Sequence, residues 1–482
     1  MTKEPNKDDS SCDFDIIIIG AGWSGLSAAQ HLQEASMSNF ILLEGRHEIG
    51  GRCRTMAING HGTMVTPCSE ATADPLSAVV ELGAQWIHDA GPNNPIYQVA
   101  VESGITMVVS DRDAGATFRG NRQIPRSEVD RQYEKLMTKG FLPYQEKQQS
   151  KSPQDVTLRK CAGAYLKKIN ATREQRLWLN YFLDSEVTQE YAASLEDLSL
   201  YWWDSEEEMG HSKTEDVHLA QDTHGGYRGV LNYYAKGITD KIQCNSQVSC
   251  IDWSQKEKID VQYRRHGRPC KLLTARTVLI TVPLGVLKAN TIQFLPELPE
   301  WKQTIINRMG VGLLNKCILL WDDTETDRLP WPQNQEWIER IDDNDQQGRW
   351  TEFYNPFPLT KRPMLCAFTA GRVAASIEAL SDDEIQTQVM SSLRSMFAPR
   401  QIPEPLQVVI TRWGQEEFAM GSYSYNAYGA SHRFRDRLAD PVDKRLYFAG
   451  EACSSAFPST THGAFLSGAK AAKAIVTKAQ SS

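Results

Sequence analysis

The chain has 482 residues, of which 41% are hydrophobic, and its formal net charge is −8. This length suggests two to three domains, and the apolar content is sufficient for a full core. The acidic balance argues against a general nucleic-acid-binding protein and suits the attraction of cationic ligands.

Residues 1–13 are polar, so we predict a disordered N-terminus without the apolar core of a signal peptide. No apolar run reaches the length of a membrane-spanning helix, which predicts no membrane partner. The ten cysteines form no C-x-x-C pair. That pattern favours thiols in a reducing compartment over a disulfide or metal framework. We therefore expect a cytoplasmic protein without a bound metal.

The first predicted unit is a strand, a glycine turn, a helix and a second strand within residues 14–44. Glycines with the G-x-G-x-x-G spacing let the backbone approach a pyrophosphate, and the helix N-terminus attracts its negative charge. The acid after the second strand can accept the ribose hydroxyls. An ordinary glycine turn is the competing interpretation. The dinucleotide contacts predicted here are Gly20, Gly22, Trp23, Ser24, Gly25 and Glu44.

A second glycine pair follows in Gly50-Gly51-Arg52, which gives the pattern Glu-x5-Gly-Gly-Arg after Glu44. Nicotinamide enzymes have no need of this pair, and the stretch resembles the FAD-dependent amine oxidase family. In that family it passes beside the FAD, with the arginine near phosphate and flavin. The resemblance implies FAD as cofactor, with Gly51 and Arg52 in contact with it.

Residues 56–80 are rich in turn-forming residues and lack periodicity, so we predict a surface loop. The next stretch, from Leu82 to His88, resembles the Leu-Gly-Ala-x-Trp motif that lies under the flavin in the amine oxidases. His88 would face the substrate, as in animal and yeast-type polyamine oxidases, and adjust the protonation of a substrate nitrogen. Without the motif, a lone histidine is more often structural. The FAD contacts implied here are Gly83, Ala84, Gln85 and Trp86.

Residues 105–224 alternate charged and apolar residues at helical spacing, which predicts a helical insertion between parts of the cofactor domain. Several acids lie between its last helix and Asp204. For most of them a solvated helix face or loop is the expected setting. One or two would line the mouth of a tunnel and hold the distal ammonium of a polyamine, and Glu186 is the first choice.

The chain then returns to the cofactor domain in 225–308, where strands are predicted at 248–253, 259–263 and 277–282. By resemblance, the backbone of Val248 meets the adenine end of FAD. Thr281 to Leu287 is also close to the family pattern.

Lys316 interrupts an otherwise apolar strand. Burying an ammonium is costly, so in isolation this lysine would be a strand-edge residue that reaches water. In the amine oxidases the aligned lysine holds a water against flavin N5 and assists reoxidation by oxygen. The resemblance implies a catalytic role here.

Strands at 364–369 and 406–413 and a helix at 382–397 form the second block of the substrate domain. Trp413 matches a cofactor-contacting tryptophan, and Tyr423 falls on the aromatic cage that flanks the amine. In monoamine oxidases a cysteine just before this aromatic residue carries the covalent flavin bond. Ser422 occupies that position here, which predicts non-covalent FAD.

A strand at 445–451 ends in Gly450 and Glu451, which resemble a second FAD contact. A Ser-Thr-Thr-His-Gly-Ala motif follows and leads into a helix at 464–478. The N-terminus of that helix would stabilise negative charge at flavin N1 and the C2 carbonyl. By resemblance, Thr460 and Thr461 contact FAD, while Ser459 and Thr460 exchange hydrogen bonds with substrate nitrogens.

The resemblance extends from about Asp13 to Ile475 and implies an α/β fold: a Rossmann-like FAD-binding domain, with a parallel sheet, helices and a β-meander, and an inserted α+β substrate domain. The predicted FAD domain consists of 14–104, 225–308 and 425–482, and the substrate domain of 105–224 and 309–424.

The implied function is that of a polyamine oxidase, which oxidises a secondary amine of spermine- or spermidine-type substrates with O2 as acceptor and is a monomer or weak dimer. Spermine, spermidine, acetylated forms and thermospermine all remain candidate substrates.

A histone lysine demethylase would need a long coiled helical insertion and an N-terminal helical domain, neither of which fits the sequence. A monoamine oxidase would carry the cysteine, and an amino-acid oxidase needs an arginine for the carboxylate. A non-catalytic flavoprotein is disfavoured by Lys316 and Tyr423.

Overall fold

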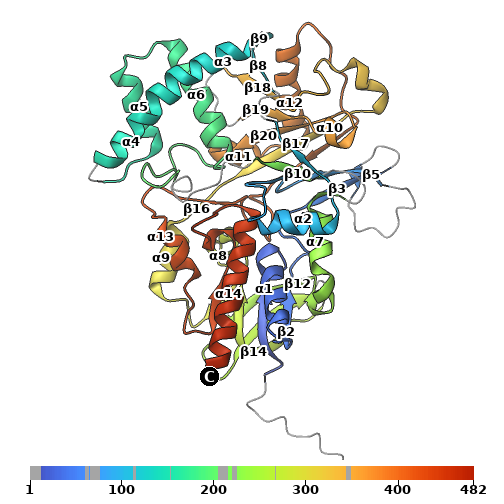
Figure 1. Ribbon diagram of the computed structural model, residues 1–482, viewed down its shortest axis with the longest axis vertical. Coiled ribbons are helices and arrows are strands. Elements are labelled where there is room, and N and C mark those ends of the chain that lie inside the picture. Colours follow the sequence, from blue (N-terminus) through green and yellow to red (C-terminus); the bar gives the residue numbers. More distant parts are fainter. Residues whose placement is uncertain are drawn as a thin grey trace, which may run out of the picture.

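The computed structural model describes residues 12–59, 64–65, 76–111, 115–151, 154–204, 215–219, 225–265, 268–343 and 349–481. Figure 1 shows two lobes, one built on each of two large sheets. No helix in these ranges combines the length and the apolar character needed to span a membrane.

The sheet of the lower lobe has the strand order β11-β2-β1-β14-β13-β12-β15, with β23 also paired to β14. Strands β1, β2, β14 and β23 run parallel, whereas β12, β13 and β14 form an antiparallel meander, so the predicted combination is confirmed. Its strands are β1 (Phe14–Ile19), β2 (Phe40–Leu43), β11 (Ile242–Gln243), β12 (Ser246–Asp252), β13 (Ile259–Arg265), β14 (Lys271–Ile280), β15 (Gln293–Leu295) and β23 (Leu446–Phe448).

Strand β1 is buried on both faces, as its apolar run predicts. Ile16 and Ile18 face one hydrophobic core, and Ile17 and Ile19 face the other. Alternation along a strand produces this division, and burying each isoleucine contributes roughly 1.5–3 kcal/mol. The strand therefore anchors the glycine turn that follows it between two packed layers.

The first and last helices of the described chain, α1 and α14, pack along each other on one face of this sheet (Figure 1). Each begins at a motif predicted to contact the cofactor. The helices of this lobe are α1 (Trp23–Glu34), α2 (Pro95–Ser103), α7 (Gly226–Ala235), η4 (Lys236–Lys241), α8 (Leu284–Lys288), α9 (Glu300–Arg308), α13 (Arg433–Ala439), η6 (Glu451–Cys453) and α14 (Thr461–Ser481).

The sheet of the upper lobe has the order β21-β17-β20-β19-β18-β8-β9. Its strands are β8 (Gly115–Arg119), β9 (Arg122–Ile124), β17 (Leu314–Leu320), β18 (Trp337–Ile341), β19 (Arg349–Tyr354), β20 (Met364–Ala370) and β21 (Gln407–Ile410). The helices associated with it are η5 (Asp323–Arg328), α10 (Phe357–Thr360), α11 (Gly371–Ile377) and α12 (Asp382–Phe397). Ser381 and Glu384 form a capping box that starts α12 where the sequence predicts it.

The predicted helical insertion is present between Arg126 and Gln189 and packs beside this second sheet (Figure 1). The prediction is wrong for the rest of 105–224 as far as it is described, because the residues on either side of these helices include β7 (Met107–Val109), β8, β9 and β10 (Val217–Leu219), and β8 and β9 belong to the sheet itself. Two segments of the insertion, η1 and η2, are π-helical, a form that is frequent at functional sites. Its elements are α3 (Arg126–Tyr133), η1 (Glu134–Phe141), α4 (Leu142–Lys151), α5 (Leu158–Lys168), α6 (Arg173–Leu183) and η2 (Asp184–Gln189). The strands of each large sheet come from the segments that were predicted to form one domain. The limits of those two domains remain a prediction.

The surface loop predicted at 56–80 is wrong. Strands β3 (Thr55–Asn59), β4 (Met64–Val65) and β5 (Leu76–Glu81) form a small antiparallel sheet there, whereas 60–63 and 66–75 lie outside the described residues. Side chains such as Ile58 and Val80 are buried. The apolar residues lie at the two ends of the stretch, and turn-forming residues separate them in the sequence. A local sequence pattern therefore does not reveal that the two ends pair.

The remaining short strands form two further small sheets. Strands β6 (Trp86–Ile87), β10 (Val217–Leu219) and β7 (Met107–Val109) pair in that order, and β16 (Gly310–Val311) pairs with β22 (Ser424–Tyr425).

Candidate active site

A cavity of about 920 Å³ contains the predicted site. Every predicted site residue lines it except Gly25. A Cβ at Gly25 would lie 2.0 Å from the carbonyl oxygen of Gly20, so this glycine allows α1 to approach the turn. Gly25 therefore serves helix packing rather than lining the cavity.

The turn before α1 fits a pyrophosphate. No side chain caps Gly22 at the start of the helix, and the buried Ser24 Oγ has no hydrogen-bond partner among the described residues. Open N–H groups and a free hydroxyl at a helix N-terminus suit phosphate oxygens. The carboxylate of Glu44 accepts hydrogen bonds from Ala21 N at 2.7 Å and Arg46 N at 2.9 Å, and burial raises its pKa.

Arg52 and Glu451 form an ion pair on the cavity wall, in which Glu451 is buried and Arg52 is partly exposed. Arg52 Nη1 donates to Glu451 Oε1 at 2.9 Å, and Glu451 Oε2 accepts from Ser424 Oγ at 2.6 Å and Ser459 N at 3.1 Å. Burial raises the pKa of Glu451, but the charges of Arg52 and Arg435 and these hydrogen bonds outweigh it and lower the pKa. The ionised carboxylate therefore fixes both the guanidinium and the turn at Ser459.

Ser422 is tied to the start of β17. Its Oγ accepts from Leu314 N at 2.8 Å and donates to Leu314 O at 2.9 Å, while its carbonyl accepts from Arg52 Nη1 at 2.9 Å. The Ser422 hydroxyl thus fixes this part of the cavity wall to β17. This is the position at which monoamine oxidases carry their flavin-linked cysteine.

Gly83 allows the backbone to pass close to Arg52. A Cβ at Gly83 would lie 1.8 Å from the carbonyl oxygen of Arg52 and 3.1 Å from the ring of Trp413. The Trp413 Nε1 donates to Leu82 O at 3.2 Å. The predicted Leu-Gly-Ala-x-Trp stretch is therefore held against the glycine-arginine segment on one side and Trp413 on the other.

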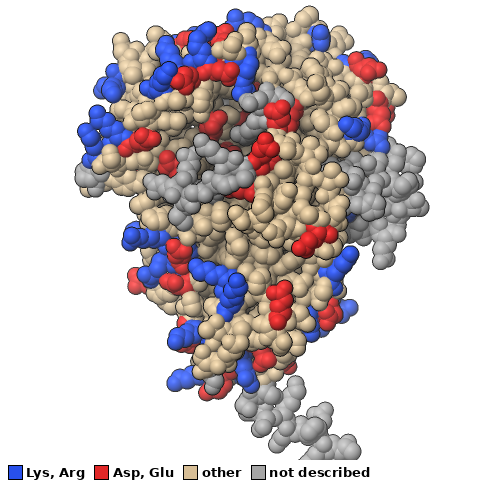
Figure 2. Space-filling model, viewed as in Figure 1, with Lys and Arg blue, Asp and Glu red and all other residues tan. Residues whose placement is uncertain are grey.

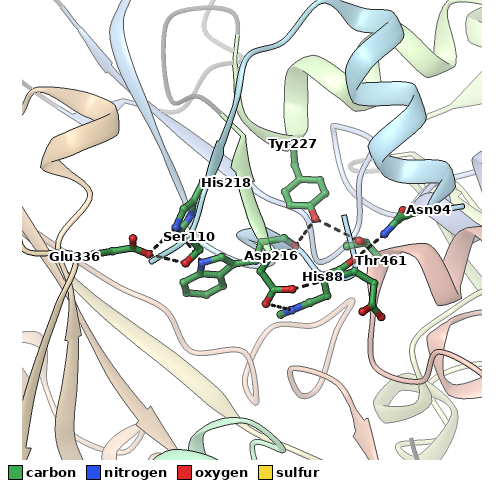
Figure 3. A network of polar contacts seen from close by, with 10 residues as sticks. His88, Asn94, Ser110, Asp216, His218, Tyr227, Glu336 and Thr461 are labelled. Atoms are coloured by element: carbon green, nitrogen blue, oxygen red, sulfur yellow. Dashed lines mark hydrogen bonds and ion pairs between the residues drawn. The ribbon is translucent and has the colours of Figure 1, made fainter. Parts of the chain in front are cut away.

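Trp86 takes part in a network of polar contacts with Tyr227 and His218, which Figure 3 labels. Tyr227 Oη donates to the Trp86 carbonyl at 2.7 Å and lies 3.3 Å from Thr461 Oγ1. His218 Nε2 lies 3.1 Å from Trp86 Nε1 and 2.9 Å from Glu336 Oε1. Burial raises the pKa of Glu336, but hydrogen bonds, led by that of His218, outweigh it and lower the pKa. The network links Trp86 to the start of α14 and to the second sheet.

Lys316 is 3% exposed and lies in β17 between two neighbouring strands, so the strand-edge interpretation is wrong. Its Nζ donates to the carbonyls of Glu81 and Gly83 and to Gln85 Oε1, each at 2.9 Å. These bonds use the three hydrogens of an ammonium, so a water can bind Nζ only by replacing an acceptor or after loss of a proton. Burial lowers the pKa of Lys316, whereas its three acceptors favour the charged form.

His88 is paired with a carboxylate that the sequence analysis missed. Its Nδ1 lies 2.8 Å from Asp216 Oδ2, and its carbonyl accepts from Asn94 Nδ2 at 2.7 Å (Figure 3). The carboxylate places the imidazole hydrogen on Nδ1, so Nε2 is the acceptor of the neutral ring. Asp216 follows 128 residues after His88, beside β10, and no local signal connects the two.

Tyr423 and the Ser-Thr pair are all oriented by backbone carbonyls. Tyr423 Oη donates to Glu190 O at 2.9 Å and Gln189 O at 3.2 Å, which fixes the edge of the ring. Ser459 Oγ donates to the carbonyl of Ser424, and Thr460 Oγ1 donates to Phe457 O at 3.0 Å. The hydroxyl hydrogens of Ser459 and Thr460 are thus already used in these bonds. The two hydroxyl groups can therefore only accept hydrogen bonds from a substrate nitrogen.

Further carboxylates line the cavity. Glu186 is exposed and lines it as predicted, and Glu190, Asp204 and Glu352 do so without having been singled out. In Figure 2, acidic side chains gather near the middle of the face. Among the described residues, no group of His, Cys, Asp and Glu could hold a metal ion.

Comparison with known proteins places this geometry in a family. The model of the flavin containing amine oxidoreductases matches residues 23–476. Polyamine oxidase 2 of Arabidopsis thaliana is 30% identical over 95% of this chain and 87% of its own length. Lysine-specific histone demethylase 1 homolog 1 of Oryza sativa subsp. japonica is 32% identical over 96% of this chain, which spans about half, 52%, of that relative.

Solved structures agree on the fold. Putrescine oxidase bound to putrescine superposes with a TM-score of 0.70 at 18% identity and covers 96% of this chain and 99% of its own. The matched family and the fit of the glycine turn, the open helix N-terminus and the Arg52 region to a dinucleotide lead to one conclusion. The chain belongs to the flavin containing amine oxidoreductase family, and its cofactor is FAD.

Proposed function

We propose that the protein is a polyamine oxidase that oxidises a secondary amine of spermine- or spermidine-type substrates. One observation carries this proposal: the cavity lined by the dinucleotide turn, Lys316 and Tyr423 also has several carboxylates in its wall, Glu186 and Asp204 among them. A chain of alternating methylenes and ammonium groups is complementary to such a wall. When bound, FAD accepts two electrons from the amine as a hydride and delivers them to O2, which yields hydrogen peroxide.

In this proposal the protein holds the amine neutral and in place. His88 Nε2 accepts the proton that the bound ammonium must lose, and Asp216 stabilises the resulting imidazolium. Tyr423 presents its ring face to the nitrogen, and its tethered hydroxyl prevents the ring from turning away. The imine product then reacts with water to give an aldehyde and a shorter amine.

Lys316 serves the oxidative half of the cycle in this proposal. Its buried position beside Gly83 and Gln85 brings a cationic group to the flavin-facing wall. A positive charge there stabilises the negative charge that develops on oxygen during its reduction.

A lysine demethylase is the competing function, because demethylase and polyamine oxidase relatives share similar identities of 32% and 30% with this chain. Anaerobic mixing with spermine, spermidine, N-acetylspermine, a methyl-lysine histone-tail peptide and benzylamine separates the two. Rapid bleaching of the flavin band by a polyamine, and not by the peptide, is the expected result. Bleaching by the peptide alone would replace the proposal with demethylation, and bleaching by none would refute it.

Non-covalent attachment of the FAD belongs to the same proposal, because Ser422 offers no thiol to the flavin. Acid precipitation should release the yellow cofactor into the supernatant. Flavin retained in the pellet would contradict the proposal.

A further inference from the structure

Asp216, the partner of His88, is placed by the register of a small antiparallel sheet. In the sheet β6-β10-β7, Val217 of β10 pairs with both neighbouring strands. Carried one residue further, this register sets Asp216 between His88 and Ser110, and Ser110 N donates to the Asp216 carbonyl at 2.9 Å. The contact between His88 Nδ1 and Asp216 Oδ2 is therefore a cross-strand pair whose geometry depends on where β10 lies.

A carboxylate from the other lobe holds the strands around Asp216. Glu336 directly precedes β18 of the upper sheet. Its Oε1 lies 2.9 Å from His218 Nε2 and accepts from Ser110 Oγ at 2.7 Å (Figure 3). Its Oε2 accepts from Asp111 N at 2.8 Å. An ionised carboxylate can only accept hydrogen bonds, so His218 Nε2 carries the hydrogen in its contact. Glu336 thus binds the strand that precedes Asp111 and the strand that follows Asp216.

The groups that Glu336 holds share one face of the small sheet with Asp216. Side chains two residues apart in a strand point to the same face, which places His218 beside Asp216. Ser110 lies opposite Asp216 in the register, and residues directly opposite each other also share a face. The side chains of His218 and Glu336 are 2% and 13% exposed, so water competes little for their hydrogen bond. These contacts therefore fix the part of β10 from which Asp216 reaches His88.

We propose that Glu336 is a positioning residue for the His88–Asp216 pair, which it holds in place through His218 and Ser110. The inference rests on the proposed function, in which His88 accepts the proton of the bound ammonium, and deepens it. Glu336 does not line the cavity, so it acts through Asp216 and not on the substrate. The proton-accepting group of one lobe thus depends on a side chain of the other lobe.

The test follows the imidazole of His88 in the FAD-loaded protein. The holoenzyme with 13C-labelled histidine is titrated by NMR without substrate, and the His88 signal is assigned by its loss in His88→Gln. Asp216→Asn removes the paired charge and should move the midpoint by ~1 pH unit or more. Glu336→Gln should move it in the same direction by at least ~0.3 pH unit, because a loosened Asp216 pairs less well. The neighbouring acids Asp89 and Glu215 are unchanged in every variant and contribute equally throughout.

A double-mutant cycle separates positioning from a direct effect of the Glu336 charge. In the Asp216→Asn background, Glu336→Gln should leave the midpoint where Asp216→Asn alone puts it, because the carboxylate that Glu336 positions is gone. Two shifts that add would overturn the proposal, since Glu336 would then act on His88 independently. An unchanged midpoint in the single variant Glu336→Gln would overturn it as well.

Glu339→Gln is the matched control. Glu339 lies in β18, three residues after Glu336, and accepts hydrogen bonds from Thr117 Oγ1 at 3.2 Å and from Tyr181 Oη, which both lie outside the small sheet. Its replacement should leave the His88 midpoint unchanged. A shift equal to that of Glu336→Gln would overturn the proposal, because any lost carboxylate near β18 would then have the same effect.

Flavin reduction by spermidine gives a second readout. Under anaerobic conditions, Glu336→Gln should lower the rate at saturating spermidine at least ~3-fold and leave the apparent Kd within ~2-fold, because the change affects proton transfer and not binding. A higher Kd at an unaltered rate would overturn the proposal.

Ser110→Ala keeps the proposal testable if Glu336→Gln does not fold or bind FAD. It removes one donor to Glu336 and should give a smaller midpoint shift in the same direction, whereas no shift would overturn the proposal. The NMR titration needs no substrate, so it decides on the positioning even if no polyamine bleaches the flavin. That absence of bleaching would refute the proposed function alone.

Discussion

At the scale of single residues, Lys316 combines a structural and a proposed catalytic role. Replacement by Met leaves the acceptors at Glu81, Gly83 and Gln85 without their donor. We expect Lys316→Met to slow flavin reoxidation roughly tenfold or more, because the charge beside the reacting oxygen is lost. Stopped-flow mixing of the reduced variant with O2 measures this rate, and an unaltered rate would exclude the role. Reduction by amine and the spectrum of bound FAD serve as controls.

The buried carboxyl of Glu81 makes the stability of the protein depend on pH. Burial raises its pKa to about 7, from an ordinary value of 4.5. The folded protein therefore binds more protons than the unfolded chain between these values, and the free energy of unfolding falls as pH rises through this range. Glu81→Gln should remove that part of the decline. Urea unfolding at pH 5 and pH 8 checks this prediction, and identical pH slopes for variant and wild type would contradict it.

Residues within a sequence motif could be named in advance as candidates, and their roles remain predictions, whereas residues brought together only by folding could not be named. Lys316, His88 and Tyr423 stand in recognisable stretches, and they line the cavity. Asp216 and Gln189 carry no signal, because their partners are supplied by strands and helices far away in the sequence. The depth of a carboxylate such as Glu352 is likewise a property of packing and not of its neighbours in the chain.

At the scale of elements, segments with strong local sequence signals were predicted well. Strand β1 and helix α12 lie where their patterns indicate, since a run of isoleucines and a capping box are local signals. The β3–β4–β5 sheet escaped prediction because its pairing joins the ends of a turn-rich stretch. The π-helical turns η1 and η2 have no sequence signature, although both contribute side chains to the cavity.

The contact between α1 and the glycine turn gives an element-scale prediction. Gly25→Ala places a Cβ 2.0 Å from Gly20 O, so α1 must shift away from the turn. We expect a loss of more than about 2 kcal/mol in the free energy of unfolding, together with weakened FAD retention. Gly163→Ala in α5 is the control, since its Cβ meets nothing within 4 Å and should stabilise by about 0.5–1 kcal/mol. Equal effects of the two substitutions on FAD content would contradict the close approach.

At the scale of the whole molecule, the net charge of −8 and the acidic cavity wall should attract polyamines from a distance. The second-order rate constant for flavin reduction by spermidine should fall as salt rises from ~0.02 to ~0.5 M, because the Debye length shortens. Benzylamine, with one charge, should respond less. Equal salt dependence of the two amines, measured by stopped flow, would show that long-range attraction does not contribute.

The packing of α1 against α14 also bears on when the protein can acquire its cofactor. The two helices whose N-termini face the dinucleotide site lie at opposite ends of the described chain. The last strand of their sheet, β23, comes shortly before α14 in the sequence. A nascent chain emerging from the ribosome therefore holds half a binding site until α14 has followed α1. Flavin capture must wait until α14 has been synthesised, so the supply of free FAD acts on chains that already contain α14 and not on shorter ones.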